Sequence, residues 1–502
     1  MNLNRLLNMK RTYLLGLGLI LSLGLQAQDP VAQKYGALIT TVDLKENLTI
    51  LASDAMEGRE TGKRGQKMAA AFISAHFEEL GLVAPVNGGY QQPVELYTTG
   101  APKIMVKSQA GELKEFEDYT YYGSGESKGI ETLDLVFAGK GSEEDLKGLD
   151  IKGKAVAILL DANASLRSNT TITSLREKGV TLVVAFSDKQ EEFNQLSGML
   201  KRFSSGRLSI SNKASANMGM FIASPATSEK LFKTSADKLK KAIADKKVAK
   251  VKPSSISFSI AQTFNPLKTS NVLGYLEGTD KKDEIVVITS HYDHIGMLPS
   301  GDGDRINNGA DDDGSGTVAV MQLAKAFTEA KKDGKGPRRS ILFMTVTGEE
   351  KGLLGSDYYT KNPIYPLANT VVNLNIDMIG RSDPQHKDSA PYVYMIGSDR
   401  LSTELHNLSE STNKTYTKLA FDYTYNAEDH PDRIYYRSDH WNFAKNNIPI
   451  IFYFDGIHED YHKPSDEVDK IEFDLLKQRA ELVFYTAWEI ANRDNRLVVD
   501  KK

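Results

Sequence analysis

Histidine and carboxylate side chains cluster at five places in the sequence, each directly after an apolar run or at the start of a helical one. The clusters are His291 to His294, Asp311 to Asp313, Glu349 with Glu350, Asp377, and His458 to His462. Imidazole nitrogens and carboxylate oxygens are ligands that divalent metals bind in proteins. Eight of the nine histidines lie between residues 291 and 462, and the chain has no Cys. A thiol nucleophile and a cysteine-ligated metal are therefore excluded, and any metal must be bound by His, Asp and Glu.

Each cluster taken alone also has an ordinary structural explanation. The run that begins at Asp311 resembles the opening of a calcium-binding loop, but Gln322 stands where that loop needs a bidentate Glu. The same run could cap the following helix and oppose its dipole, and Glu349 with Glu350 could be an exposed pair. A carboxylate at Asp377, ending an apolar strand, is costly unless it is paired or bound to a metal. Because all five clusters occur together, we favour a metal site.

Strands and helices alternate along the chain from about residue 263, and they must bring these clusters together. The apolar patterns predict strands over 284–290, 339–347, 371–377 and 448–455, and helices over 317–330 and 473–493. This alternation indicates an α/β fold with a mixed, mostly parallel central sheet and helices on both faces. In such sheets ligands bind at the carboxyl ends of the strands. Since the polar clusters stand at those ends, we expect them to meet in one crevice.

Residues 106–262 have a different sequence pattern, in which short apolar runs at 136–141, 155–161 and 181–188 are separated by turns. These runs are typical of strands in a smaller α/β domain. We therefore expect one main domain in two parts, 28–105 and 263–502, interrupted by an inserted domain over 106–262. A helix is predicted over 224–247, and its lysines recur at helical spacing, which indicates a solvated face.

Residues 1–27 have the pattern of a secretory signal peptide. A basic segment that ends at Arg11 precedes an apolar run over 13–25, and a cleavage site fits after Ala27. The run of about 13 residues is shorter than the ~20 needed to span a bilayer. We expect export to the periplasm or the extracellular space, with no stable membrane insertion after cleavage. The formal net charge is -4, or -7 without the three basic residues of the signal peptide. The chain therefore lacks the excess of positive charge that is typical of nucleic-acid-binding proteins.

Five short motifs occur in a fixed order within residues 263–493. They are His-Tyr-Asp at 291–293, Gly-Ala-Asp-Asp-Asp-Gly-Ser-Gly at 309–316, Gly-Glu-Glu at 348–350 with Gly-Leu-Leu-Gly-Ser at 352–356, Ile-Asp-Met at 376–378, and Tyr-His-Lys-Pro-Ser-Asp at 461–466. With these motifs the sequence resembles the di-zinc leucyl aminopeptidase (aminopeptidase Y) family of metallo-exopeptidases, and residues 33–100 resemble it more loosely. Residues 106–262, with Val-Phe-Ala-Gly-Lys-Gly at 136–141, resemble the protease-associated domain often inserted in such enzymes. The resemblance implies that the main domain is a catalytic zinc peptidase domain.

The resemblance also implies that the chain binds two zinc ions through five side chains. Asp312 would bridge the two ions. Glu350 and His462 would complete the site of one ion, and His291 and Asp377 would complete the site of the other.

Three further roles follow from the same resemblance. Glu349 would be the general base, which is physically reasonable because adjacent side chains at a strand end diverge and one carboxylate can stay free of the metal. Asp293 would accept a hydrogen bond from the imidazole of His291 and fix its orientation. The tyrosine that stabilises the oxyanion would be Tyr435, although Tyr436 stands next to it.

These expectations describe an exported di-zinc aminopeptidase that hydrolyses the N-terminal bond of peptides with a free N-terminus. Two alternatives on the same fold are a glutaminyl cyclase, which works with a single zinc, and a metal-free binding protein. The complete set of His291, Asp312 and Asp377 argues against the cyclase. A binding protein should have lost a ligand or the base, and none of them is missing from the sequence.

Overall fold

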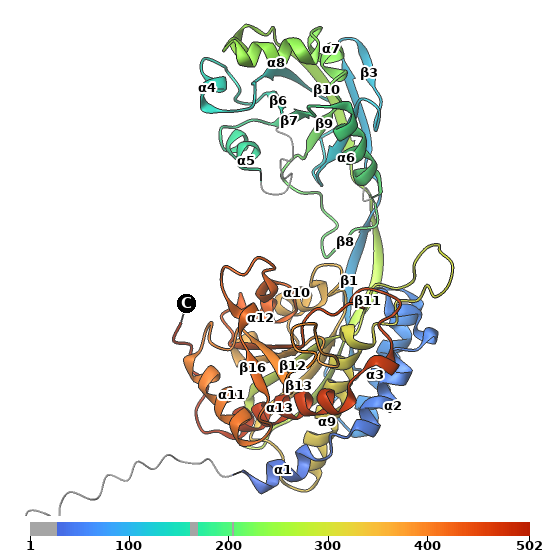
Figure 1. Cartoon of the computed structure of the whole chain (residues 1–502), viewed down its shortest axis with the longest axis vertical. Helices are drawn as coiled ribbons and strands as arrows, with labels where there is room; N and C mark the ends of the chain where they lie inside the picture. The colour runs from blue at the N-terminus through green and yellow to red at the C-terminus, as the bar shows by residue number, and fades with distance from the viewer. Residues whose placement is uncertain (1–27, 161–168, 203–204, 502) are drawn as a thin grey trace, which may run out of the picture. The chain divides into compact units, whose positions relative to one another are not determined.

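The computed structural model describes residues 28–160, 169–202 and 205–501 (Figure 1). The predicted signal peptide, residues 1–27, lies outside the described residues. The chain divides into two compact units, one formed by Met1–Gln92 with Asn271–Lys502 and the other by Pro93–Ser270. The predicted limits of the inserted domain, 106 and 262, lie inside the second unit. Within the described residues, no helix has the length and apolar character needed to cross a membrane.

The first unit contains a mixed sheet with the strand order β16-β15-β17-β14-β12-β13-β11. The pairs β12/β13, β12/β14 and β14/β17 are parallel, whereas β11 is antiparallel to β13 and β15 is antiparallel to β17. The bounds are β11 (Phe264–Leu276), β12 (Lys281–His291), β13 (Arg339–Val346), β14 (Thr370–Ile376), β15 (Tyr392–Ile396), β16 (Ala420–Asp422) and β17 (Ile450–Phe454). The predicted α/β fold with a mixed, mostly parallel sheet is confirmed.

Both faces of this sheet are buried, which explains why its strands are apolar along nearly their whole length. In β12, Val286 and Ile288 belong to a core on one face, and Ile285 and Val287 belong to a core on the other. This alternation is the period of two that a strand imposes on its side chains. The sheet is therefore held by hydrophobic burial on both sides, and its polar groups are left at the strand ends.

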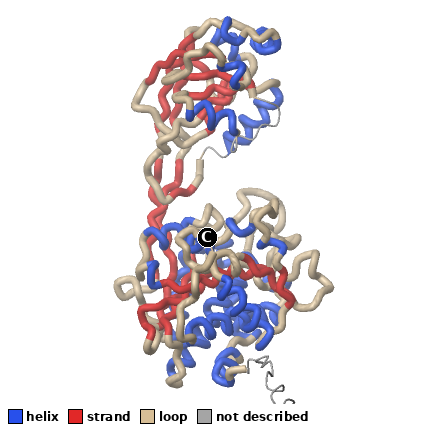
Figure 2. Tube along the Cα trace, turned by 90° about the vertical axis from the view of Figure 1, so that its left-hand side faces the viewer, coloured by secondary structure: helices blue, strands red, loops and turns tan. Residues whose placement is uncertain are grey.

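Helices cover both faces, as predicted, and Figure 2 distinguishes them (blue) from the strands (red). The core that contains Val286 also includes side chains of α1 (Pro30–Gly36), α2 (Thr41–Leu51), α3 (Arg64–Leu80), α9 (Gly316–Lys332), α11 (Thr403–Thr415) and α13 (Phe473–Asn492). The opposite core includes side chains of α10 (Leu354–Lys361) and α12 (His440–Ala444). Short helical turns connect these elements at η2 (Asp54–Arg59), η4 (Ala310–Ser315), η5 (Leu367–Asn369), η6 (Thr424–Asn426), η7 (Ile434–Tyr436) and η8 (Val468–Lys470).

The second unit has its own sheet, with the strand order β3-β2-β10-β5-β6-β7-β9-β4. The strands are β2 (Lys103–Ser108), β3 (Gly111–Leu113), β4 (Tyr119–Tyr122), β5 (Glu131–Phe137), β6 (Ala155–Leu159), β7 (Leu182–Phe186), β9 (Met220–Ala223) and β10 (Ser254–Ala261). The helices are α4 (Glu143–Leu146), α5 (Thr170–Glu177), α6 (Gln190–Arg202), α7 (Thr227–Phe232), α8 (Ala236–Ala244) and the turn η3 (Val248–Lys250). The antiparallel pair of β1 (Gln91–Thr99) and β8 (Leu208–Ser209) follows β11 in the strand order of the first, nine-stranded sheet.

The sequence predicts one helix over 224–247, and that prediction is wrong in one respect, because the structure contains two helices there. Lys233 follows the last residue of α7 with φ 51°, a left-handed conformation that ends a helix. The hydroxyl of Thr234 then donates to the carbonyl oxygen of Phe232 at 3.1 Å, a local bond that competes with the helical pattern. The lysines of this segment are therefore divided between two short helices, which contain Lys230 and Lys238, Lys240 and Lys241, and the turns that follow them, which contain Lys233, Lys246 and Lys247.

Candidate metal centre

The predicted ligands lie at one edge of the first unit's sheet, where four parallel strands end. β12 ends at His291, and β14 ends directly before Asp377. β13 ends three residues before Glu349, and β17 is followed by the loop that carries His462. Asp312 lies in η4, just before α9. Because the carboxyl ends of neighbouring parallel strands share an edge, these side chains come together.

Asp312 lies between two imidazoles, with one carboxylate oxygen near each. Its Oδ1 is 3.2 Å from Nε2 of His291, and Asp377 Oδ1 is 3.4 Å from the same nitrogen. Its Oδ2 is 3.1 Å from Nε2 of His462, which is also 3.1 Å from Oε2 of Glu350. The five predicted ligands thus form two groups that share Asp312.

The spacing of these donor atoms fits metal coordination. Two tetrahedral ligands, each bound to zinc at about 2.1 Å, lie roughly 3.4 Å apart, close to the 3.1 to 3.4 Å found in the two groups. His291 and Asp312 are buried, with 1% and 3% of their surface exposed. Buried carboxylates are costly unless a cation or hydrogen bonds compensate them. The donor set, all nitrogen and oxygen, is therefore suited to one metal ion in each group.

A second histidine, His294, contacts the group that contains Glu350. Its Nδ1 lies 2.8 Å from Oε1 of Glu350 and 3.8 Å from Oδ2 of Asp312. It is fully buried, and its ring nitrogens make no well-directed hydrogen bond to any described residue. His294, which belongs to the cluster at 291–294 that the sequence singled out, therefore lies beside the second group of candidate ligands.

Two further carboxylates hold the loop that carries Asp312 by accepting backbone N–H groups. Asp313 accepts from the N–H of His291 at 3.1 Å, of Gly316 at 2.9 Å and of Met378 at 3.0 Å. Although its carboxylate lies within reach of His291, these bonds occupy both of its oxygens. Asp466 accepts from the N–H groups of Asp311 and Asp312, each at 3.1 Å. The backbone on both sides of Asp312 is thus fixed.

A buried arginine links the same loop to the end of β12. The guanidinium of Arg59, fully buried in η2, donates to the carbonyl oxygens of Tyr292 at 2.9 Å, Asn308 at 2.6 Å and Gly309 at 2.8 Å. It also donates to the carbonyl of Leu51 at 3.0 Å. Sequence reasoning missed this residue, because its partners are backbone groups distant in the sequence.

Asp293, predicted to orient His291, makes its closest contact through its backbone. Nδ1 of His291 lies 3.0 Å from the carbonyl oxygen of Asp293 and 4.0 Å from the carboxylate. The carboxylate accepts from the hydroxyl of Thr61 at 2.7 Å and from the N–H of Glu349 at 3.2 Å. The backbone of Asp293 therefore orients the imidazole, and its side chain holds the segment that bears the predicted base.

The clustered carboxylates raise the proton affinity of the two imidazoles. Burial lowers the pKa of His291, but Asp377, Glu349 and Asp312 outweigh it and raise that pKa well above its usual range. Burial likewise lowers the pKa of His462, and its two carboxylate neighbours raise it to about 10. A divalent cation would neutralise the same negative field, and metal binding releases such protons. Burial raises the pKa of the Glu349 carboxyl well above its usual range, so this group can retain a proton.

A cavity beside the candidate ligands has one polar and one apolar wall. His291, Asp312, Glu349 and Asp377 line the polar side. The apolar side is formed by Met378, Ile434, Phe452, Phe454 and Ile457. Arg437 and Tyr461 complete the lining. The lining thus combines Glu349 and the candidate metal ligands with hydrophobic side chains.

The structure does not bring the predicted Tyr435 to this cavity. Its ring is buried under the guanidinium of Arg400, which lies 4.9 Å from the ring centroid. The neighbouring Tyr436 is exposed, with Arg433 over its ring. Tyr461 lines the cavity instead, and its ring stacks on His462 at 3.9 Å. The only sequence signal for Tyr461 is its place directly before a predicted ligand.

Comparisons with known proteins match part of the chain. Residues 271–487 match Peptidase family M28, so this segment, which contains all five predicted ligands, has the sequence pattern of that family. Aminopeptidase YwaD of Bacillus subtilis is 27% identical over 249 residues, 48% of this chain and 49% of that protein. A probable leucine aminopeptidase of Arthroderma otae is 29% identical over 219 residues, 42% of this chain and 55% of that one. The chain thus spans about half the length of the curated relatives it matches. The solved structure of an aminopeptidase from Aneurinibacillus sp. strain AM-1 has the same fold, with a TM-score of 0.54 and 19% identity over 94% of this chain and 98% of that one.

Proposed function

We propose that this protein, whose residues 271–487 match Peptidase family M28, is an exported zinc aminopeptidase that hydrolyses the N-terminal bond of peptides. The observation that carries the proposal is the convergence of five side chains from separate segments, with donor atoms spaced as ligands of shared ions. The names of the matched relatives, an aminopeptidase and a probable leucine aminopeptidase, support the same reaction. The signal-peptide pattern of residues 1–27 supports export.

Two zinc ions fit the two groups of donors. His291 and Asp377 would hold one ion, Glu350 and His462 the other, and Asp312 would bind both. Bound there, zinc supplies Lewis-acid polarisation of the scissile carbonyl and lowers the pKa of water to about 7. The remaining chemistry falls to side chains of the cavity.

Glu349 is placed to move the proton. Its carboxylate lines the cavity, with Oε2 3.9 Å from Nε2 of His291. From this position the carboxylate can take a proton from the attacking water and release it to the leaving amine, as a general base does. Its backbone N–H is fixed by the carboxylate of Asp293, which keeps the base in place.

Tyr461 is placed to stabilise the developing oxyanion. Its phenol ring lines the cavity and is oriented by stacking on His462. Burial raises the pKa of Tyr461, and the carboxylates of Asp312 and Glu350 raise it further, so the hydroxyl keeps its proton and can donate it in a hydrogen bond. We assign the contact to Tyr461 in place of Tyr435, because Tyr435 does not line the cavity.

The apolar wall is placed to receive the first side chain of the substrate. Phe452, Phe454 and Ile457 line the same cavity as the polar groups. Burial of an apolar side chain there gains roughly 25 cal/mol per Å² of apolar surface. We therefore expect peptides that begin with an apolar residue to be preferred over those that begin with a charged one.

The test counts zinc and measures hydrolysis of an aminoacyl anilide by the wild type and Glu349→Ala. We expect two zinc ions per chain in both, and a kcat about 10² to 10⁴ times lower in the variant. Glu329→Ala, which removes an exposed carboxylate on α9, is the matched control and should behave as wild type.

Three outcomes would contradict the proposal. If kcat of Glu349→Ala stays within about tenfold of wild type, Glu349 is not the base. If an N-acetylated substrate is cleaved equally well, the protein is not an aminopeptidase. One zinc ion per chain, with cyclisation of an N-terminal Gln and no peptide hydrolysis, would identify a glutaminyl cyclase instead.

A further inference from the structure

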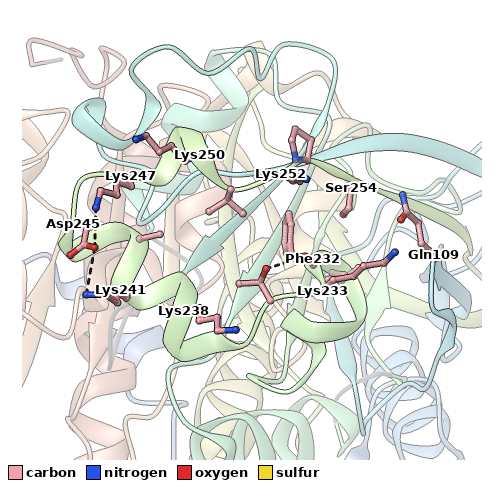
Figure 3. A pocket seen from close by; sticks show the side chains of 15 residues that line it. Gln109, Phe232, Lys233, Lys238, Lys241, Asp245, Lys247, Lys250, Lys252 and Ser254 are labelled. Atoms are coloured by element: carbon pink, nitrogen blue, oxygen red, sulfur yellow. Dashed lines mark hydrogen bonds and ion pairs between the residues drawn. The ribbon is translucent and has the colours of Figure 1, made fainter.

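A second, larger cavity lies within the unit formed by Pro93–Ser270, and lysines surround it (Figure 3). It is an open cavity of about 750 Å³, which we call the lysine cavity. Its lysines are Lys233, Lys238, Lys241, Lys247, Lys250 and Lys252, and the only acidic side chain of its lining is Asp245. All six lysines are exposed, so their ammonium groups are accessible to a ligand.

The break between α7 and α8 helps to shape this cavity. α7 ends at Phe232, Lys233 turns the chain with φ 51°, and α8 begins at Ala236. The chain then passes through η3 and enters β10 at Ser254. Leu231 and Phe232, both buried in the core of the unit, and the partly buried Val251 supply apolar surface to the lining. The lysine cavity therefore combines apolar surface from buried residues, which we call its floor, with exposed positive side chains.

Most of its positive charge is uncompensated. Asp245 pairs with Lys241 and Lys247, each at 3.5 Å, and chiefly Lys241 holds the pKa of Asp245 below its usual range. For the other four lysines, Lys233, Lys238, Lys250 and Lys252, no carboxylate lies within ion-pair distance among the described residues. Four lysines that line one cavity thus have no counterion among the described residues.

The composition of the whole segment points the same way. Residues 93–270 contain 26 Lys and Arg against 20 Asp and Glu, whereas the rest of the chain contains 36 against 46. The positive charge of the chain is therefore concentrated in the unit that contains the lysine cavity. Such an asymmetry attracts anionic partners and speeds their association.

We propose that the lysine cavity binds an acidic peptide segment, with several Asp or Glu side chains paired to its lysines and an apolar side chain against its floor. Single exposed ion pairs are weak, roughly 0.2 to 1 kcal/mol each, so a ligand must offer several carboxylates at once. Arginine forks bind phosphate groups bidentately and exposed aromatic rings stack on nucleic-acid bases, so sites for those ligands commonly contain both in addition to lysines. Among the described residues that line the cavity there is no Arg, and its one aromatic ring, Phe232, is buried.

The proposal does not depend on hydrolysis, and its test is arranged accordingly. The probe is an N-acetylated, fluorescent peptide with alternating Glu and Phe, which has no free amine. Its binding to the full zinc-loaded chain is measured by fluorescence anisotropy, beside a peptide in which Gln replaces each Glu. We expect the acidic peptide alone to bind, and its affinity to fall as salt is raised from about 50 to 300 mM, because salt screens exposed charges.

The decisive variant reverses the four uncompensated lysines, K233E/K238E/K250E/K252E. We expect it to weaken binding at least about tenfold, as removal of several pairs requires. The matched control reverses four exposed lysines of the same unit that do not line the cavity, K103E/K128E/K152E/K213E. Circular dichroism and anilide hydrolysis check that both variants fold.

Several results would overturn the proposal. Equal weakening in the two variants would assign binding to net charge and not to the lysine cavity. Equal binding of the Gln peptide would exclude recognition of carboxylates. Binding of a sulfated polysaccharide without binding of the acidic peptide would identify another ligand class.

Discussion

Arg59 should be essential to the stability of the first unit although it binds no metal. Its guanidinium is fully buried and donates to four backbone carbonyls at 2.6 to 3.0 Å, those of Leu51, Tyr292, Asn308 and Gly309. Each hydrogen bond to a charged group contributes about 1.5 to 3 kcal/mol. In Arg59→Met, the four acceptors lose their donor. Because such losses are not additive and water can enter, we expect a destabilisation of about 3 to 5 kcal/mol.

Urea unfolding can measure this effect in the first unit specifically. Both tryptophans of the chain, Trp441 and Trp488, lie in that unit, so their fluorescence reports its unfolding. The control is Arg64→Met, because Arg64 is 72% exposed and pairs with Glu57 at the surface. A surface pair of this kind contributes about 0 to 1 kcal/mol.

Zinc binding provides a second measurement. Arg59 holds the carbonyl of Tyr292, which directly follows His291, and the carbonyl of Gly309, three residues before Asp312. The variant should therefore also bind zinc about 10 to 100 times more weakly. If Arg59→Met loses no more stability than Arg64→Met and binds zinc as the wild type does, the guanidinium does not hold these segments and the reasoning fails.

Two further predictions concern single side chains near the ligands. Tyr461→Phe should lower kcat about 10² to 10³ times with little change in KM, as loss of an oxyanion donor does. Tyr435→Phe should leave kcat within about threefold. If instead Tyr435→Phe has the large effect on kcat and Tyr461→Phe the small one, Tyr435 is the oxyanion group. Asp466→Asn should weaken zinc binding about 10 to 100 times, because an amide cannot accept from both Asp311 and Asp312 in the same way. Zinc titration of Asp466→Asn against Asp469→Asn, which changes an exposed carboxylate of η8 three residues further on, tests this, and equal affinities would contradict it.

That the five proposed ligands lie close together could be predicted from the sequence, because they follow elements with plain apolar patterns. The runs that become β12 and β14 end at His291 and just before Asp377, and a parallel sheet places such ends at one edge. Each strand could be predicted from its own residues alone, because the apolar pattern of a strand depends only on its local sequence. The pairing of each ligand with a particular ion came from family resemblance, and the distances around Asp312 agree with that grouping.

The residues that hold the backbone could not be predicted, because a carbonyl or N–H group is the same in every residue. Arg59 contacts Gly309 from 250 positions earlier, and nothing in either local sequence indicates the bond. Tyr435 and Tyr461 show a related limit. Both stand near motif residues, and only the packing of Tyr435 under Arg400 shows which of the two lines the cavity.

The motif Tyr-His-Lys-Pro-Ser-Asp at 461–466 shows how chemistry and support are combined in one short segment. His462 faces the carboxylate of Asp312, and Asp466, four residues later, accepts the backbone N–H of that same Asp312. The turn between them is closed by the N–H of Asp466, which donates to the carbonyl of Lys463 at 3.1 Å. A shift of this loop would therefore move two groups together, the imidazole of His462 and the carboxylate of Asp466 that holds the backbone of Asp312. The separation of His462 and Asp312, the two side chains proposed to bind one ion, is therefore controlled by the contacts that residues 461–466 make with Asp312.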